Sequence, residues 1–80
     1  MISSAQCRAA RGLLAWSQQD LAATAEVGLS TVRDLETGRR EISEAKRTQI
    51  RAVLEKAGVE FLDENGKGDG ARLVKPARRR

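Results

Sequence analysis

The residues that could carry chemistry in this chain are concentrated between Ser17 and Arg40. This stretch reads SQQDLAATAEVGLSTVRDLETGRR and combines short polar side chains with arginines. Two short amphipathic helices fit into it, and only a tight turn fits between them. The second helix ends at Gly38, which Arg39 and Arg40 follow. A compact helix pair with a polar outward face and a basic exit suits insertion into the major groove of DNA.

Catalytic and metal chemistry find no support elsewhere in the chain. There is no His to act as a general base, and Cys7 has no cysteine or histidine partner. The segment 63–74 superficially suggests a calcium loop, but Lys67 and Val74 stand where oxygen ligands are needed. The glycine-rich run 66–70 is not followed by the Gly-Lys-Ser/Thr start of a phosphate-binding helix. We therefore expect no enzyme activity, no cofactor and no metal.

Length and composition limit the fold to one small domain. Eighty residues build one modest core, with little room for a deep substrate pocket. One Cys and no His exclude a disulfide framework and a Cys/His zinc site within one chain. We interpret Cys7 as a small core residue of an apolar-periodic helix. No apolar run approaches the ~20 residues of a membrane span, and no signal peptide is visible, so we expect a cytoplasmic protein.

The positive charge belongs mostly to the end of the chain. The net charge is +4, but residues 72–80 hold five of the fifteen basic side chains. The remainder has ten basic and eleven acidic side chains, or −1. This balance favours an anionic partner but does not locate its site.

Capping residues and apolar spacing predict four helices. The first begins at Ser3 or Ser4 and runs to about residue 15, and Gly12 within it suggests that another backbone approaches closely. A capping box of Ser17 and Asp20 starts the second. The third runs over about 29–37, with a glycine at each end. The fourth runs over about 43–57.

The pattern changes after Gly58. Val59–Leu62 and Ala71–Val74 read as short strands, joined by the glycine-rich loop DENGKGDG. Asn65-Gly66 within that loop could also form a tight two-residue turn. We therefore divide the chain into a helical domain, a β-hairpin and a basic disordered tail, at 1–58, 59–75 and 76–80.

Residues 7–57 resemble the helix-turn-helix domain of the Cro and phage-repressor family, also called the xenobiotic-response-element family. The similarity covers about two-thirds of the chain and is specific because it fixes many positions at once. The matching groups are Trp16-Ser17-Gln18, Asp20-Leu21-Ala22, Val27, Ser30-Thr31-Val32 and Leu35-Glu36-x-Gly38. The resemblance implies an all-α, four-helix, lambda-repressor-like domain of a bacterial or phage transcription regulator, here with a short C-terminal β-hairpin.

The resemblance also implies which residues read DNA bases. Four residues match the groove-facing side of the family's recognition helix: Leu29, Ser30, Arg33 and Asp34. Arg33 can bond to guanine O6 and N7, Ser30 to either kind of base, and Leu29 can touch a thymine methyl group. Asp34 either accepts from cytosine N4 or holds an arginine in place. The alternatives are that Leu29 closes the core, Ser30 caps the helix, and Arg33 lies on a solvated face and pairs with Asp34 or Thr37.

A second set of residues matches the family's contacts to the DNA backbone. These phosphate-facing positions are Gln18, Thr37, Arg39 and Arg40. Lys46 or Arg47 is a further candidate because of its positive charge. Gln18 could instead bond only to water, and the two adjacent arginines could be ordinary solvated charge.

Glu36 needs a separate explanation, because the helix macrodipole disfavours an anion in the last turn. Arg40 could offset it in an exposed pair worth about 0.3–0.5 kcal/mol. The family's matching positions instead form a largely buried ion pair between Arg11 and Glu36, which we favour and regard as structural. The chain departs from the family at Glu26, which stands where a left-handed glycine is usual. Such a residue costs about 1 kcal/mol or takes a different turn. Gly28 also replaces the usual polar N-cap.

One recognition helix reads only a few base pairs, so we expect a homodimer on double-stranded DNA, with half-sites ~34 Å apart. We expect Phe61, Leu62 and Val74 of the hairpin to be exposed and to pair with a second copy in a four-stranded sheet. The hairpin could instead fold back onto the fourth helix. Two rival functions are a protein-interaction module on the same fold and an antitoxin that binds a toxin protein and its own operator. The near-neutral charge outside the tail favours these rivals.

Overall fold

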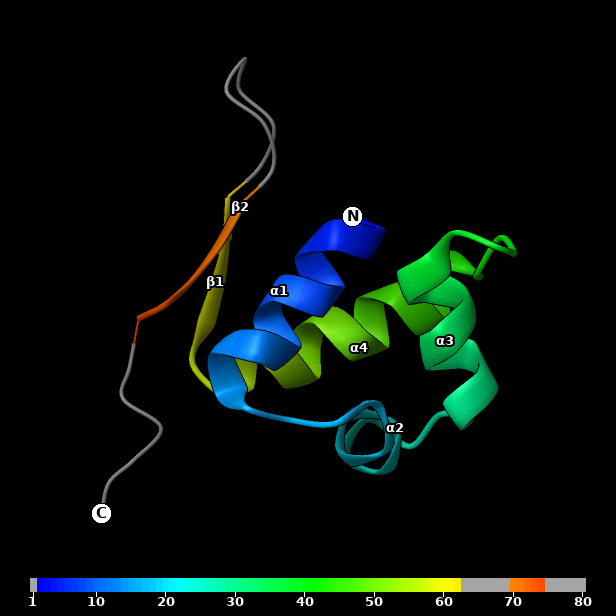
Figure 1. Cartoon of the computed structure of the whole chain (residues 1–80), viewed down its shortest axis with the longest axis horizontal. Helices are drawn as coiled ribbons and strands as arrows, with labels where there is room; N and C mark the ends of the chain where they lie inside the picture. The colour runs from blue at the N-terminus through cyan, green and yellow to red at the C-terminus, as the bar shows by residue number, and fades with distance from the viewer. Residues whose placement is uncertain (1, 63–69, 75–80) are drawn as a thin grey trace.

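The computed structural model describes residues 2–62 and 70–74. Four helices are followed by a two-stranded antiparallel hairpin, which confirms the predicted fold class. The elements are α1 (Ser4–Leu14), α2 (Gln18–Ala25), α3 (Leu29–Thr37), α4 (Glu44–Lys56), β1 (Val59–Leu62) and β2 (Gly70–Leu73). α1 and α4 lie in the middle, between α3 on one side and the hairpin on the other (Figure 1). The predicted Asn65-Gly66 turn and the tail 76–80 lie outside the described residues.

Serine caps start three of the helices. The Ser3 side chain accepts from the backbone N–H of Gln6, whose own side chain accepts from the Ser3 N–H. Ser17 and Asp20 form the same reciprocal pair at α2, with both hydrogen bonds at 2.9 Å. Ser43 accepts from a backbone N–H at the start of α4. The helix starts are therefore fixed locally, as the sequence predicts.

Left-handed residues end the first three helices. Ala15, Glu26 and Gly38 have φ values of 58°, 59° and 70°. Glu26 therefore adopts the left-handed conformation instead of a different turn, and an L side chain there costs about 1 kcal/mol. The Val27 N–H bonds back to the Ala22 carbonyl at 3.0 Å and closes the turn. The short connection between α2 and α3 is thus set by a strained non-glycine residue.

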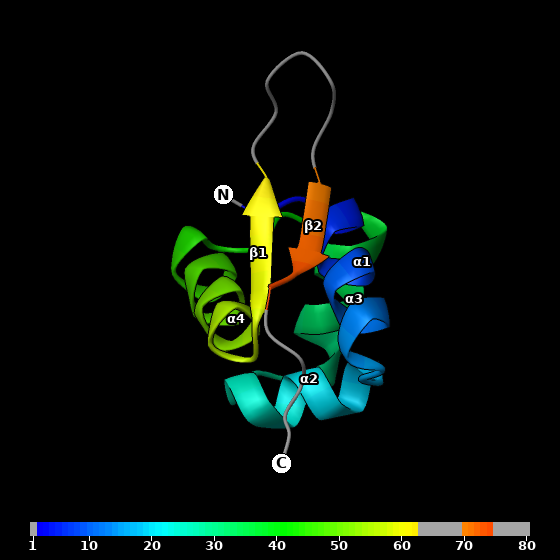
Figure 2. The same ribbon diagram turned by 90° about the vertical axis from the view of Figure 1, so that its left-hand side faces the viewer.

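The helices and the hairpin share one hydrophobic core. The hairpin lies across α1 and α4 (Figure 2) and adds Val59 and Phe61 to that core. Phe61 is only 7% exposed, so the expectation that it is exposed is wrong. The register pairs Val59 with Leu73 and places Val59 and Phe61 on the inner face. The hairpin thus folds back onto the helices, and it contacts α1 as well as the expected α4.

Gly12 has no close neighbour. A β-carbon added there would meet nothing within 4 Å among the described atoms, and the residue is exposed. The predicted close backbone approach at Gly12 is therefore wrong.

Candidate nucleic-acid interface

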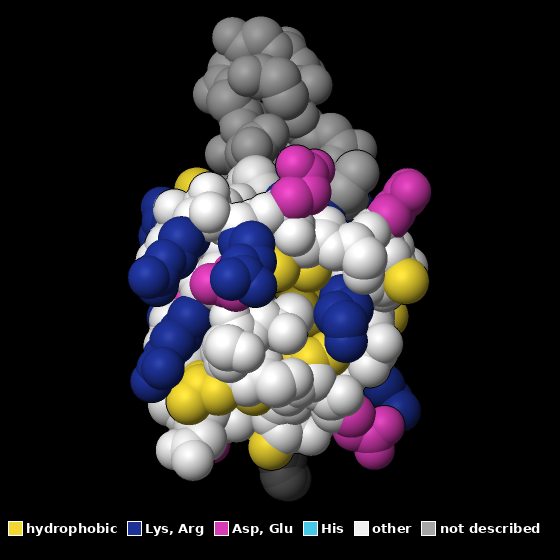
Figure 3. All heavy atoms as spheres, turned by 90° about the vertical axis from the view of Figure 1, so that its right-hand side faces the viewer, with side chains coloured by type: hydrophobic (Ala, Val, Ile, Leu, Met, Phe, Trp, Pro, Cys, Tyr) yellow, Lys and Arg dark blue, Asp and Glu magenta, His cyan; other side chains and the backbone are white. Residues whose placement is uncertain are grey.

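α3 has one buried and one exposed side. Val32 and Leu35 are fully buried and anchor the helix in the core. Ser30, Arg33 and Thr37, at intervals of three and four residues, are exposed. The face of the molecule on which α3 lies carries Lys and Arg side chains across it, while acidic side chains lie mostly toward its rim (Figure 3). A short amphipathic helix therefore stands at the surface with its polar side outward.

The structure separates the alternatives for the residues predicted to read bases. Gly28 is the N-cap of α3 and Ser30 lies one residue inside the helix, so Ser30 is not the cap. Arg33 has no ion-pair partner within residues 2–62 and 70–74. Leu29 is half-buried and packs against the core, so it helps to close the core. Ser30 and Arg33 thus present polar groups to solvent.

Asp34 faces an arginine that follows the helix. The distance from Arg40 Nε to Asp34 Oδ2 is 3.9 Å, and the Arg40 side chain is largely exposed. This contact is at the outer limit of an ion pair and contributes little to stability. Asp34 therefore lies close to one of the predicted phosphate contacts, and Arg40 does not pair with Glu36.

Thr37 fastens the end of α3. Its hydroxyl donates to the Arg33 carbonyl at 2.8 Å and accepts from the backbone N–H of Arg39 at 3.3 Å. The second bond satisfies the backbone N–H that directly follows the Gly38 cap. Arg39 and Arg40 follow directly and are exposed. Two guanidinium groups thus stand at the exit of the helix, as the sequence predicts.

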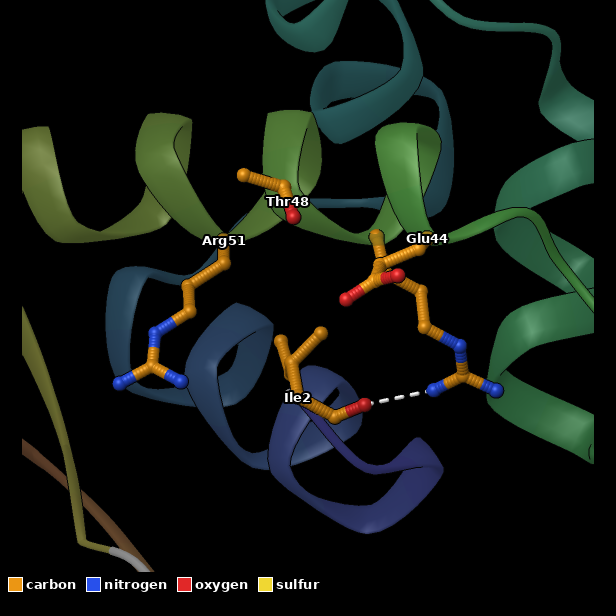
Figure 4. Close-up of a pocket in the computed structure, with 5 residues that line it drawn as sticks. Ile2, Glu44, Thr48 and Arg51 are labelled. Carbon is orange, nitrogen blue, oxygen red and sulfur yellow. Dashed lines mark hydrogen bonds between the residues drawn. The ribbon is translucent and has the colours of Figure 1, made fainter.

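The remaining residues predicted to contact DNA phosphates differ in what their side chains bind. Gln18 is half-buried, and its amide donates to Glu36 Oε1 at 3.0 Å. Arg47 donates from Nη1 to the Ile2 carbonyl at 2.6 Å, beside a hollow of about 150 Å³ between α4 and the start of the chain (Figure 4). Arg47 therefore holds the N-terminal segment, which argues against its use as a phosphate contact. Lys46 is exposed.

The predicted ion pair between Arg11 and Glu36 is present. Arg11 Nε lies 2.6 Å from Glu36 Oε2, and Arg11 Nη2 lies 2.8 Å from Glu36 Oε1. Arg11 also donates to the Trp16 carbonyl at 2.9 Å. The Glu36 side chain is 2% exposed and gains a further donor, the Cys7 thiol, at 3.3 Å. A buried carboxylate at an unfavourable helix end is thus surrounded by hydrogen-bond donors.

Burial and hydrogen bonding shift the pKa values of Glu36, Arg11 and Cys7. Burial alone would raise the pKa of Glu36, but hydrogen bonds from Arg11, Gln18 and Cys7 outweigh it and lower that pKa. The hydrogen bond to Glu36 raises the pKa of Arg11. Burial and the neighbouring Glu36 carboxylate raise the pKa of Cys7 to about 12. The pair is therefore ionised at neutral pH, and the thiol is protonated.

α1 holds the C-terminal half of α3 at several points. The Ser4 hydroxyl donates to the Leu35 carbonyl, and the Arg8 guanidinium donates to the Glu36 carbonyl. Sequence reasoning missed both contacts, and it missed the Cys7 contact to Glu36. Each joins residues about thirty positions apart, and no local pattern marks such a pair. Together with the ion pair, these bonds fix the position of α3 on the domain.

Two other kinds of site are not found in the part of the chain that the structure describes. No group of three or more Cys, Asp or Glu residues there could hold a metal ion. No helix there is long and apolar enough to cross a membrane.

A comparison with known protein families finds a family model that matches this helix arrangement. The sequence model described as Helix-turn-helix matches residues 8–56, more than half of the chain. The matched region contains α2, α3 and α4 in full and most of α1. A comparison with curated proteins finds no match.

Proposed function

Since this chain belongs to the Cro/C1-type helix-turn-helix family of DNA-binding proteins, we propose that it is a sequence-specific transcriptional regulator that reads the major groove with α3. One observation carries the proposal. α3 is anchored by Val32 and Leu35, while Ser30 and Arg33 on its other side face solvent. A rigid helix with outward polar groups meets the geometric need of groove recognition.

The base-reading residues of α3 are Ser30 and Arg33, supported by Leu29 and Asp34. Arg33 is exposed and has no ion-pair partner in the described part of the chain, so its guanidinium is available for guanine O6 and N7. Ser30 lies one turn earlier with an exposed hydroxyl. Leu29 offers its exposed part to a thymine methyl group, and Asp34 either reads cytosine or orients Arg40.

The phosphate contacts are Arg39 and Arg40, with support from Thr37 and Gln18. Both arginines are exposed just after α3, where they reach the backbone on one side of the groove. The amide nitrogen of Gln18 has two hydrogens. One is donated to Glu36, and the other can reach a phosphate oxygen. Binding should weaken steeply with salt, because neutralised phosphates release counterions.

The protein acts as a homodimer through its hairpin. Leu62 and Val74 are 41% and 51% exposed; Leu62 lies on the face of β1 opposite to Phe61, and Val74 directly follows β2. Their burial against a second copy would remove two exposed apolar side chains from water. Phe61 supports this surface from beneath and is not itself in contact with the partner.

Selection of bound sites from random DNA duplexes tests the proposal, followed by gel shifts on the enriched site and on a random duplex. We expect Arg33→Ala to weaken specific binding by about 1–3 kcal/mol and to relax one base position. Arg39→Ala should weaken binding to both duplexes equally. It should also reduce the slope of log affinity against log salt concentration by about 1. Lys56→Ala is the matched control, because it removes one positive charge from an exposed position at the end of α4, outside both α3 and the hairpin.

Two outcomes would contradict this function. Equal losses for Arg33→Ala on both duplexes would show that Arg33 is not a reader. A folded wild-type protein that enriches no site would favour the protein-interaction module or a toxin-binding role instead.

Light scattering of point variants tests the dimer. Leu62→Lys and Val74→Lys should shift the protein toward the monomer at micromolar concentration without unfolding it, because both side chains are exposed. Deletion of the hairpin is a poor test, because β1 supplies Val59 and Phe61 to the core. An unchanged dimer in both variants would place the interface elsewhere.

A further inference from the structure

Gln6 of α1 is a buried polar residue that holds both strands of the hairpin. It is 4% exposed. Its amide nitrogen donates to the Leu62 carbonyl at 3.1 Å and to the Gly70 carbonyl at 3.0 Å. Leu62 and Gly70 are cross-strand partners, the pair of the described register that lies furthest from Gly58. One amide group thus joins α1 to β1 and β2 at the same point.

The contact with the hairpin explains why position 6 is Gln and not Glu. The amide oxygen of Gln6 accepts from the Ser3 N–H at 3.0 Å and completes the capping box of α1. Glu serves equally well in a capping box, and its negative charge interacts favourably with a helix N-terminus. A carboxylate, however, cannot donate to two carbonyl oxygens. The amide is therefore required by the hairpin and not by the helix cap.

α1 connects this contact to the recognition helix. Ser4 and Arg8, on either side of Gln6, donate to the carbonyls of Leu35 and Glu36 near the end of α3. In Figure 1, α1 lies between the hairpin and α3. Hydrogen bonds from one short segment of one helix thus fix both the hairpin and α3.

We infer that Gln6 is a positioning residue that sets the distance and angle between the two recognition helices of the dimer, and hence the half-site spacing that the protein accepts. This inference rests on the proposed function, in which the hairpin joins two copies on DNA. If the hairpin is the joint between copies, its orientation on α1 determines where each α3 lies. One base pair of spacing changes the required separation by about 3.4 Å and the required rotation by about 35°.

The test compares three variants on duplexes that carry two selected half-sites with different spacer lengths. Gln6→Glu keeps the acceptor for the Ser3 N–H and removes the donor to the hairpin. Gln6→Leu removes the donor without adding charge, and it serves if the first variant does not fold. Ser3→Ala is the matched control, because it weakens the α1 cap and leaves the amide contacts in place. Circular dichroism establishes that each protein is folded.

The wild-type protein should prefer one spacing by about 100-fold over spacings one base pair longer or shorter, because a mismatched spacing prevents both helices from engaging. Gln6→Glu and Gln6→Leu should bind neighbouring spacings within about threefold of one another, with unchanged affinity for a single half-site. Ser3→Ala should keep the wild-type preference. A folded Gln6 variant that keeps the wild-type spacing preference would overturn this inference but not the proposed dimer. The same would follow if Ser3→Ala lost the spacing preference as fully as the Gln6 variants. A wild-type protein with no spacing preference would overturn both this inference and the proposed dimer.

Discussion

Arg11 and Glu36 join α1 to α3 through two parallel hydrogen bonds, at 2.6 and 2.8 Å, although their positions differ by twenty-five residues. The carboxylate is almost completely buried, and the guanidinium is partly exposed. Such a pair is costly to break on one side only, because the remaining charge stays buried without a partner. The stability of the domain therefore depends on this contact more than on its exposed ion pairs.

We predict that Arg11→Ala lowers the free energy of unfolding by about 3–5 kcal/mol. Urea unfolding followed by circular dichroism measures it. Arg72→Ala is the matched control, because it breaks an ion pair with Glu60 in which both side chains are exposed. That loss should not exceed about 1 kcal/mol. Similar small losses in both variants would show that the buried pair contributes no more than an exposed one.

Stability should fall in acid through Glu36. Its pKa is lowered in the folded protein, whereas an unfolded Glu titrates near ~4.3. The folded state therefore binds this proton more weakly, and its stabilising contribution is present above about pH 4.3 and is lost as the pH falls through the native pKa. Urea unfolding between neutral pH and acid should show a steeper decline for the wild type than for Glu36→Gln. If the free energies of unfolding of the two proteins fell in parallel with pH, Glu36 would not be the source of the acid sensitivity.

Cys7 should resist thiol reagents until the protein unfolds. Its side chain is fully buried and its pKa is raised to about 12, whereas an unfolded cysteine titrates near ~8.5. At mildly alkaline pH the thiolate fraction in the native protein is lower by about 10³-fold. Labelling with a disulfide reagent, with and without urea, should show a difference in rate of that order. Fast labelling of the folded protein would mean that the Cys7 contact with Glu36 opens readily.

The left-handed end of α2 offers a stabilising change. Glu26 has a φ of 59°, and glycine adopts that conformation without steric cost. After the entropy that glycine loses on folding is subtracted, Glu26→Gly should raise the free energy of unfolding by up to about 0.5 kcal/mol. Gly38→Ala is the reverse control at a φ of 70°, and it should lower the free energy of unfolding by a similar amount. Thermal unfolding measures both, and changes of the same sign would contradict the argument.

The sequence predicts the helical part of this fold well because the signals are local. Ser17 and Asp20 mark the start of α2, and Gly28 and Gly38 bound α3 at the observed residues. The family resemblance also carries the Arg11 and Glu36 pair, since both positions belong to the matched pattern. Caps and helix ends depend on a few neighbouring residues, and for that reason they can be read from a single chain.

The hairpin could not be placed in the same way. Alternation along β1 shows that Val59 and Phe61 share a face, but apolar Leu62 lies on the other face, so the pattern does not say which side is buried. The choice is made by contacts with α1 and α4, which are distant in sequence. The same reason explains why the roles of Gln6 and Cys7 were missed. Each depends on a partner that only the assembled fold brings near.

Trp16 gives this molecule an optical probe of its own. The chain has one Trp and no Tyr, so its near-ultraviolet emission comes from a single indole. The Trp16 side chain packs against the core between α1 and α2. The backbone carbonyl of Trp16 accepts a hydrogen bond from Arg11. A change in emission colour or polarisation would therefore report movement at the buried carboxylate without any attached dye, including when a duplex is added.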